Sequence, residues 1–315
     1  MAGIIPGCVC AHAMLMVCVH TSNHGVRRTR PGRTPTMSPK VVLITGTSSG
    51  IGLSAAIAAA RAGWRTVATL RDPDRADALR KAAADAGVEL DVRQLDVVDE
   101  ASVAAAIDGV IADHGRLDAV VNNAGAGHLG TLENETVADV RAVMEVNFFG
   151  VLNVSKAALP HLRATGGRLI TVTSVGGVVG QPFNEAYCAA KFAVEGYMES
   201  LAPVAASVGV AVSVVEPGAV ATEFVNNIRL DLEAEIAEAG PYAPALTAYL
   251  DRTVAQFLNG AQTPDAAAET VLEALTADRP AFRLQTSDWA RGFTGTKLND
   301  LDGSAVLGMT GSWVG

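Results

Sequence analysis

The chain has little of what a disulfide framework or a metal site needs. Four cysteines occur in 315 residues, and three of them, Cys8, Cys10 and Cys18, fall among the first 38. Because Cys188 stands alone beyond them, no disulfide framework can form there, and we expect a reducing, cytoplasmic location. Cys8 and Cys10 with His12 lack a second pair of ligands, so we predict no metal site.

Charged residues and long apolar runs are also scarce. Charged side chains make up 18% of the chain, and beyond residue 38 there are 20 basic against 33 acidic residues. Such an acidic protein repels nucleic acid, which excludes a nucleic-acid partner. The apolar stretch 13–19 is too short to cross a bilayer and has no basic residue before it. We therefore predict neither a signal peptide nor stable membrane insertion.

Residues 1–38 differ from everything after them. Four arginines lie among prolines and glycines there, without one acidic residue. We expect this leader to be poorly ordered, and Met37 offers an alternative start that would leave it out of the native protein. Residues 39–315 are expected to form one domain, because the hydrophobic content of 49% allows a sizeable core and no change of composition marks a linker.

Short β-rich runs alternate with longer alanine-rich segments of helical periodicity from residue 41 onward. The runs are almost continuously apolar, which is typical of strands buried on both faces of a parallel sheet. We therefore predict an α/β fold, with a Rossmann-type doubly wound parallel sheet. The expected strands are 41–45, 65–70, 89–95, 117–121, 168–173, 210–215 and 282–285.

One long region, about 223–277, separates the last two expected strands. Pro241, Pro244 and Pro264 are expected to divide it into short helices. An insertion after a strand end is well placed to cover a ligand crevice, so we predict a helical substrate lid. Additional packing helices are the alternative. The region contains no histidine, which leaves residues such as Tyr242 and Tyr249 to hold a polar group of a substrate.

Three side chains carry the most chemical information. Tyr187 and Lys191 are one helical turn apart and share a helix face, and Ser174 lies thirteen residues before the tyrosine. A nearby cation favours the phenolate and lowers a tyrosine pKa from its usual ~10, which makes the phenol a usable general acid or base. A serine hydroxyl from a strand end can stabilise charge on the same substrate oxygen. The trio predicts proton transfer at a carbonyl or alcohol oxygen, although tyrosine–lysine pairs also occur on ordinary solvated helices.

A glycine-rich string follows the first expected strand directly. It reads TGTSSGIG from Thr45 to Gly52, and we expect a helix to open at Leu53. Glycines permit a tight turn and let backbone amides reach a pyrophosphate at the positive end of the helix. Because the string occupies a strand-to-helix junction, it predicts a dinucleotide site.

The end of the second expected strand bears on the choice of cofactor. Arg71 stands about where a ribose-binding acid would mark an NAD enzyme, and its guanidinium could hold a 2′-phosphate. The sequence therefore favours NADP(H). Asp72 leaves NAD(H) open, and a solvated turn before Pro73 would account for both charges.

The motifs occur in the order of a known family. Beside the glycine string and the trio, the chain contains Asp96-Val97, Asn122-Asn123-Ala124-Gly125, Asn147 and Pro217-Gly218 with Thr222. Over roughly residues 39–285 this set resembles the short-chain dehydrogenase/reductase family. Within it, residues 68–72 and 174–188 are most similar to the branch of type 1 17β-hydroxysteroid dehydrogenase and photoreceptor-type retinol dehydrogenases.

The resemblance implies a role for each matching position. Ser174 would bind the substrate oxygen, Tyr187 would exchange the proton, and Asn147 would hold a water in a proton relay. Lys191 would hold nicotinamide ribose hydroxyls and acidify the tyrosine. The positions implied or predicted to bind the cofactor are Gly46, Ser48, Ser49, Gly50, Ile51, Gly52, Arg71, Asp96, Val97, Asn123, Ala124, Gly125, Tyr187, Lys191, Pro217, Gly218, Val220 and Thr222.

Together these features predict an NADP(H)-dependent oxidoreductase that interconverts a carbonyl and an alcohol on a hydrophobic, steroid-, retinoid- or lipid-like substrate. Substrate contacts are expected from Ser174, Val178, Phe183, Tyr187 and Phe224. Two alternatives stay open: a 3-oxoacyl thioester reductase, and a non-catalytic protein that senses NADP(H) through the same fold. The resemblance also implies a homodimer or homotetramer, formed through helices around residues 140–163 and 184–207.

Overall fold

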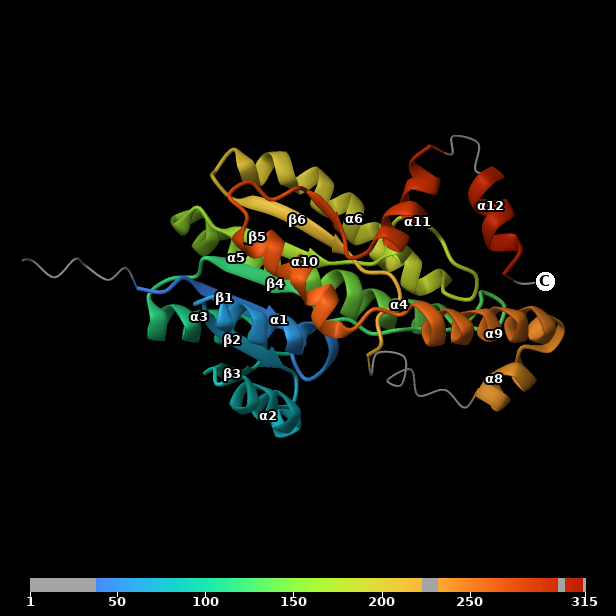
Figure 1. Ribbon diagram of the computed structural model, residues 1–315, viewed down its shortest axis with the longest axis horizontal. Helices are drawn as coiled ribbons and strands as arrows, with labels where there is room; N and C mark the ends of the chain where they lie inside the picture. Colours follow the sequence, from blue (N-terminus) through green and yellow to red (C-terminus); the bar gives the residue numbers. More distant parts are fainter. Residues whose placement is uncertain (1–37, 223–231, 300–303, 314–315) are drawn as a thin grey trace, which may run out of the picture. The chain divides into compact units, whose positions relative to one another are not determined.

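A seven-stranded sheet, parallel throughout, organises the part of the chain that the structure describes (Figure 1). This computed structural model describes residues 38–222, 232–299 and 304–313, so the leader lies outside the described residues except for Ser38. The strand order is β3-β2-β1-β4-β5-β6-β7, and the predicted fold class is confirmed. The strands are β1 Val41–Thr45, β2 Arg65–Leu70, β3 Asp91–Gln94, β4 Ala119–Asn122, β5 Arg168–Val172, β6 Ala211–Glu216 and β7 Arg283–Gln285.

Helices connect the strands and extend the chain beyond β7. The α-helices are α1 Gly50–Arg61, α2 Asp77–Ala86, α3 Glu100–His114, α4 Val137–Met144, α5 Gly150–Thr165, α6 Glu185–Ala206, α8 Leu232–Glu238, α9 Ala243–Gly260, α10 Pro264–Thr276, α11 Asp288–Leu298 and α12 Ser304–Gly311. Single turns are η1 Pro73–Arg75, η3 Val175–Gly177 and η4 Gly240–Tyr242, and η2 Glu145–Phe149 is a π-helical turn between α4 and α5.

The strands alternate between two apolar clusters, one on each face of the sheet. On β1, Val41 and Leu43 join the cluster with α3, α5 and α6, whereas Val42 and Ile44 join the cluster with α1, α2 and α10. Successive side chains of a strand point to opposite faces, so a strand buried on both sides favours apolar residues at consecutive positions. This explains why the central strands are nearly continuous apolar runs, interrupted by a few buried polar residues such as Thr69 and Ser213.

The edge strand β3 departs from that pattern. It reads DVRQ and is only partly buried. Arg93 pairs with Asp91 at 2.6 Å and with Asp113 of α3 at 2.7 Å. With a neighbour on one side only, β3 can carry charges whose pairing partners lie at the sheet edge. The predicted run 89–95 therefore contains a shorter strand than its length suggested.

The helical boundaries correct the sequence-based expectations in three places. α1 begins at Gly50 rather than at Leu53, because the second half of the glycine string already forms the first helical turn. α9 is a single helix of 18 residues, since Pro244 sits in its first turn, where proline is tolerated. The end of the expected lid, 264–276, is α10, which packs against α1 over the sheet.

We predict that α10 is a structural layer of the core and not a mobile cover. Leu275→Ala should lower the free energy of unfolding by about 2–5 kcal/mol, because Leu275 is 2% exposed and its removal leaves a cavity. Glu269→Ala, on the exposed side of the same helix, should change it by less than about 0.5 kcal/mol. Urea denaturation measures both, and a small loss for Leu275→Ala would contradict the assignment.

Candidate active site

Most of the predicted site residues follow the carboxyl ends of the parallel strands. Between β1 and β4 the strand order reverses, because chain connections leave β1 toward β2 and return at β4. In open α/β sheets the crevice for a ligand lies outside the carboxyl ends at such a switch point. The glycine string follows β1 and residues 123–125 follow β4, so the fold brings these two predicted segments together.

Two glycines make the contact between these segments, and a third faces the loop after β6. A Cβ on Gly46 would lie 2.7 Å from Ala124 Cα, and one on Gly52 would lie 2.3 Å from Asn123 Nδ2. Gly46 and Gly50 also have positive φ angles of 69° and 59°, which side chains disfavour. On Gly50, a Cβ would lie 3.1 Å from Thr222 Cγ2, so the loop after β6 also packs against the glycine string.

Hydrogen bonds fix the two loops to each other. The Thr45 hydroxyl accepts hydrogen bonds from the backbone N–H groups of Asn123 and Ala124, both at 3.0 Å. The Asn123 amide donates to the carbonyls of Thr45 and Gly46 at 2.9 and 3.0 Å. Asn123 therefore shapes the glycine turn with its side chain.

The start of α1 fits an anionic group. Ser49 occupies the N-cap position with extended backbone, yet its side chain makes no capping hydrogen bond, and the first turn holds no acidic residue. The first backbone amides of the helix are thus left for an outside acceptor, which the helix dipole favours when it is negative. These free amides at the positive end of the helix suit a dinucleotide pyrophosphate. Ser48 and Ile51 flank the turn.

The charged residues after β2 have distinct surroundings. Asp72 caps η1, where its Oδ1 accepts a hydrogen bond from Asp74 N at 3.1 Å. Arg71 is exposed, and its backbone carbonyl accepts a hydrogen bond from the Gln94 amide at 3.2 Å. The Asp72 carboxylate therefore hydrogen-bonds within η1, while the Arg71 side chain is exposed to solvent.

The remaining cofactor candidates are held by the backbone around them. Asp96 Oδ1 accepts a hydrogen bond from Val98 N at 3.2 Å, and the buried Val97 packs against Gly150. The Pro217 carbonyl accepts from Val175 N at 3.0 Å, which joins the loop after β6 to the loop after β5. A Cβ on Gly218 would lie 3.0 Å from the Trp289 ring, and Val220 bridges to Gln262.

The predicted trio meets between β5 and α6. Ser174 follows β5 and its hydroxyl accepts a hydrogen bond from Gly176 N at 2.9 Å, while Tyr187 and Lys191 lie on the first two turns of α6. Ser174 and Tyr187 are hydrogen-bonded to each other. Both border Gly176, where a Cβ would lie 3.3 Å from Ser174 Oγ and 3.4 Å from Tyr187 Cε1.

Burial is the largest cause of the pKa shifts of Lys191 and Tyr187. Lys191 is 4% exposed, and its ammonium donates to the Val172 carbonyl at 3.2 Å. Burial lowers the pKa of Lys191 to about 8, against the attraction of the Glu195 carboxylate. Burial raises the pKa of Tyr187, although the hydrogen bond with Ser174 acts to lower it.

The raised pKa of Tyr187 is opposite to the sequence-based prediction, which was a lowered tyrosine pKa. Lys191 Nζ lies 5.8 Å from the centroid of the Tyr187 ring and bonds to the backbone of β5. Burial of the phenol is therefore the largest cause acting on the pKa of Tyr187.

Asn147 lies in the π-helical turn η2 and is fully buried. Its amide donates to the carbonyls of Ala126 and Val143 at 2.9 and 3.1 Å, and its Oδ1 accepts from Ala126 N at 3.2 Å. The position of a Cβ on Gly125 lies 2.9 Å from Asn147 Oδ1 and 3.5 Å from Lys191 Nζ. Asn147 thus holds the loop after β4 beside the lysine, and its role in a water relay stays a prediction.

The predicted substrate residues lie in an apolar wall beyond the trio. Val178 and Phe183 belong to a buried cluster with Leu246 and Tyr249 of α9 and with Phe293 and Trp313. Phe183 has a positive φ of 57°, a strained conformation for a side-chain-bearing residue, and its carbonyl accepts from Gly130 N at 2.9 Å. Phe224 lies outside the described residues.

The sequence analysis missed the carboxyl-terminal aromatic residues of this wall. Trp289 stacks on Phe293 with centroids 4.9 Å apart, and Phe293 on Trp313 at 5.8 Å. Two of the three tryptophans of the chain lie in this carboxyl-terminal segment. This concentration of aromatic residues could have indicated an apolar wall from the sequence. Tyr249, expected to hold a polar group, instead accepts a hydrogen bond at its hydroxyl from the Asn184 amide at 2.8 Å.

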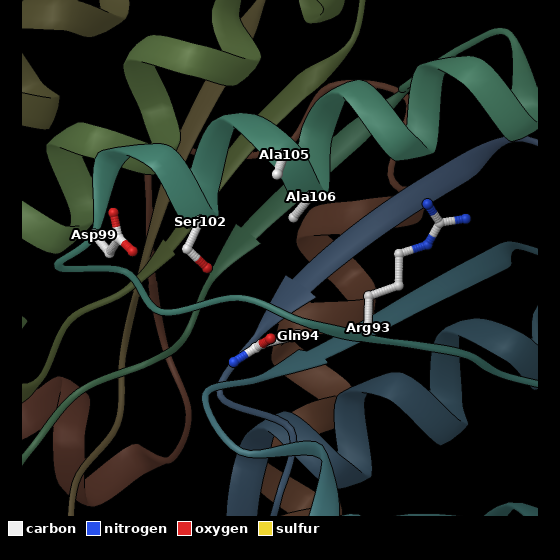
Figure 2. Close-up of a pocket in the computed structure, with 6 residues that line it drawn as sticks. All are labelled: Arg93, Gln94, Asp99, Ser102, Ala105 and Ala106. Atoms are coloured by element: carbon white, nitrogen blue, oxygen red, sulfur yellow. The ribbon is translucent and has the colours of Figure 1, made fainter.

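Two surface hollows differ in their relation to this site. A hollow of about 210 Å³ is bordered by Leu129, Phe183 and Leu246, so it adjoins the apolar wall. A hollow of about 400 Å³ lies between β3 and α3 and is lined by Arg93, Gln94, Asp99, Ser102, Ala105 and Ala106 (Figure 2). The larger hollow is not lined by the trio, and its Arg93 is paired with Asp91 and Asp113, so the trio remains the candidate for the chemistry.

Comparisons with known proteins agree with this geometry. The family described as short chain dehydrogenase matches residues 40–233. The chain belongs to the short-chain dehydrogenase/reductase family. A second description, the NAD(P)H binding domain of trans-2-enoyl-CoA reductase, matches residues 4–73. As a member of the short-chain family, the protein is an oxidoreductase of alcohol and carbonyl chemistry.

Two relatives of this short-chain enzyme come from the branch that the sequence resembles. It is 37% identical over 278 residues to retinol dehydrogenase 8 of Bos taurus, covering 86% of this chain and 88% of that one. It is 39% identical over 277 residues to 17-beta-hydroxysteroid dehydrogenase type 1 of Homo sapiens, covering 85% and 84%.

Solved structures show the same fold. A short-chain dehydrogenase from Streptomyces avermitilis has a TM-score of 0.69 at 30% identity, covering 87% of this chain and 96% of that one. An alcohol dehydrogenase from Thermococcus sibiricus complexed with 5-hydroxy-NADP has a TM-score of 0.63 at 28% identity, covering 78% and 95%.

We predict that the charge of Lys191 destabilises the fold of this short-chain enzyme. Lys191→Met should raise the free energy of unfolding at pH 7, by on the order of 3 kcal/mol at most, because a lysine pKa near 8 when folded against 10.5 when unfolded penalises the charged form. The gain should shrink as pH rises from about 8 to 10.5, since the lysine then becomes neutral in both states. Urea denaturation over this pH range tests it.

Lys156→Met on α5 is the control, since Lys156 is exposed and its replacement should give no such pH dependence. A Lys191→Met effect of constant size across the range would refute the explanation.

Proposed function

We propose that the protein is an NADP(H)-dependent oxidoreductase that interconverts a carbonyl and an alcohol on a hydrophobic, steroid-, retinoid- or lipid-like substrate, with Tyr187 as the acid or base. The observation that carries the proposal is the meeting of Ser174, Tyr187 and Lys191 beside the loops that border the dinucleotide crevice. When bound there, the nicotinamide supplies the hydride chemistry.

The protein groups have separate tasks in this reaction. The Ser174 hydroxyl and the Tyr187 phenol are hydrogen-bonded to each other, so a substrate oxygen that replaces this mutual bond can accept a hydrogen bond from each of them. Donors aimed at an oxygen that gains charge in the transition state lower the barrier. Tyr187 donates its proton during reduction and takes one back during oxidation. Lys191 anchors ribose hydroxyls and supplies positive charge to the phenol.

The surroundings of β2 support NADP(H) as the cofactor. Leu70 is buried and Asp72 caps its own turn, whereas Arg71 is exposed. A guanidinium can bind a 2′-phosphate with two hydrogen bonds. NADPH is the reductant of biosynthesis in cells, so reduction of a ketone or aldehyde is the proposed direction.

The wall beyond the trio supports a hydrophobic substrate. Val178, Phe183 and Phe293 are apolar and buried, and the adjoining hollow is bordered by Leu129 and Leu246 as well as by Glu235. The names of the two relatives point to retinoids and steroids, which have this apolar character.

We also propose a cytoplasmic homodimer or homotetramer without stable membrane insertion. Phe149, Tyr197 and Val204 are exposed at 44%, 47% and 64% on η2 and α6, within the helices expected to form the subunit contact. The helical stretch 137–165 is long and apolar enough to cross a membrane. However, Val154 and Leu162 within it pack on the sheet, as expected for a core helix.

Replacing Tyr187 with Phe tests the reaction. We expect kcat to fall by at least ~10³, because the substituted ring cannot exchange a proton, while NADPH binding changes by less than about threefold. Turnover is measured in both directions across steroids, retinoids, aliphatic ketones and 3-oxoacyl thioesters. Tyr197→Phe, an exposed tyrosine on the same helix, should keep full activity.

The outcomes separate the alternatives. Tyrosine-dependent activity on thioesters alone would select a 3-oxoacyl reductase, and cofactor binding without any turnover would select an NADP(H) sensor. Turnover that persists in Tyr187→Phe would remove Tyr187 from the mechanism.

Replacing Arg71 with Ala tests the cofactor. NADPH affinity should fall by roughly 10- to 100-fold, since a hydrogen-bonded charge pair is lost, while NADH affinity should hold. Fluorescence titration of both cofactors measures this, with Arg75→Ala in the neighbouring turn η1 as the control. An equal loss for both cofactors would contradict a 2′-phosphate contact.

A further inference from the structure

Glu195 is a carboxylate in the interior of the protein, one helical turn beyond Lys191 on α6. It is 3% exposed. Its Oε1 accepts a hydrogen bond from the Thr173 hydroxyl at 2.5 Å, and its Oε2 accepts one from Arg283 Nη1 at 2.8 Å. A carboxylate so deeply buried keeps its charge only when it is paired and hydrogen-bonded, and both oxygens meet that condition.

Arg283 of β7 stands among three carboxylates. Besides Glu195, it binds Glu216 of β6 at 3.0 Å and Glu199 of α6 at 2.7 Å. Glu216 is fully buried and also accepts a hydrogen bond from the Gln285 amide at 2.9 Å, whereas the Glu199 side chain is 63% exposed. Arg283 thus holds three carboxyl groups of α6 and β6 together.

The Glu195 carboxylate also acts on Lys191. Burial lowers the pKa of Lys191 to about 8, and the negative charge of Glu195 acts to raise it. Burial raises the pKa of Glu195 itself to about 7, helped by Glu216 and opposed by Thr173 and Arg283. Both groups therefore titrate near neutral pH, and the charge of one affects the charge of the other.

The same carboxylate ties the two elements that carry the trio. Thr173 lies between Val172, whose carbonyl accepts the Lys191 ammonium, and Ser174. The bond from Thr173 to Glu195 thus holds the end of β5 against α6. Glu195 also borders Gly177 of η3, where a Cβ would lie 3.0 Å from its Cγ, so the carboxylate side chain has little room to move.

We propose that Glu195 is a positioning residue: its carboxyl group fastens the β5 end with Ser174 to α6 and lies one helical turn from Lys191, while the ion pair with Arg283 holds that carboxyl group in place. The inference deepens the proposed function, on which it rests for the role of Lys191 in the reaction. The effect of the Glu195 charge on Lys191 is a property of the folded protein, so it can be measured without a substrate.

The test is an NMR titration of lysine side chains in the full chain. The chain has five lysines, and the Lys191 signal is assigned by its loss in Lys191→Arg. In Glu195→Gln, which keeps the oxygen that accepts from Thr173, the midpoint of Lys191 should fall by roughly one to two pH units. In turnover assays the basic limb of kcat/KM should move down by the same amount.

Three further variants separate the effect of charge from that of packing. Glu199→Gln removes an exposed carboxylate from the same arginine and should leave the Lys191 midpoint within about 0.3 units, because water screens it. Thr173→Val removes the hydrogen bond that joins β5 to α6 but leaves the carboxyl group in place, so kcat should fall while the Lys191 midpoint moves less than in Glu195→Gln. Glu195→Asp keeps the charge and should restore the midpoint.

Glu195→Met serves if Glu195→Gln does not fold, since a buried charge can often be replaced by an apolar side chain of similar size. An unchanged Lys191 midpoint in whichever of the two folds overturns the proposal. A shifted midpoint in a protein that turns over no substrate supports the role of Glu195 and counts against the proposed function, so the two failures are distinguishable.

Discussion

The reversal of strand order between β1 and β4 is the constraint on which the site depends. It leaves the loops after these two strands side by side, with no crossing helix between them. The Thr45 hydroxyl and the Asn123 amide then join the loops through four hydrogen bonds. Gly46 and Gly52 are required because the loops approach more closely than a Cβ allows.

α6 connects this crevice to the chemistry. Its first turns carry Tyr187 and Lys191, its next turn carries Glu195, and its inner face holds Met198 in the core. A helix fixed along its length by packing can hold a buried ammonium at a defined distance from a phenol. The same burial disfavours charge on both groups, so the site keeps ionisable residues where the fold alone would select apolar ones.

The sequence predicted the fold well because the central strands are buried on both faces. Short β-rich runs such as 41–45 and 65–70 were sufficient to locate them, and the two observed strands have the same bounds. The polar edge strand β3, the onset of α1 and the layer position of α10 were less well predicted. Each depends on what packs against the element, which local periodicity does not contain.

The sequence by itself determined the membership of the family, the parallel sheet, and which residues are the candidates for the chemistry, because spacing along a helix or after a strand is a local property. Only the tertiary structure decided the electrostatics. It placed Lys191 against the Val172 carbonyl, raised the tyrosine pKa by burial, and gathered Glu195, Glu216 and Arg283 from separate elements. A pKa depends on surrounding charges and on exclusion from water, and both come from residues that are distant in the chain.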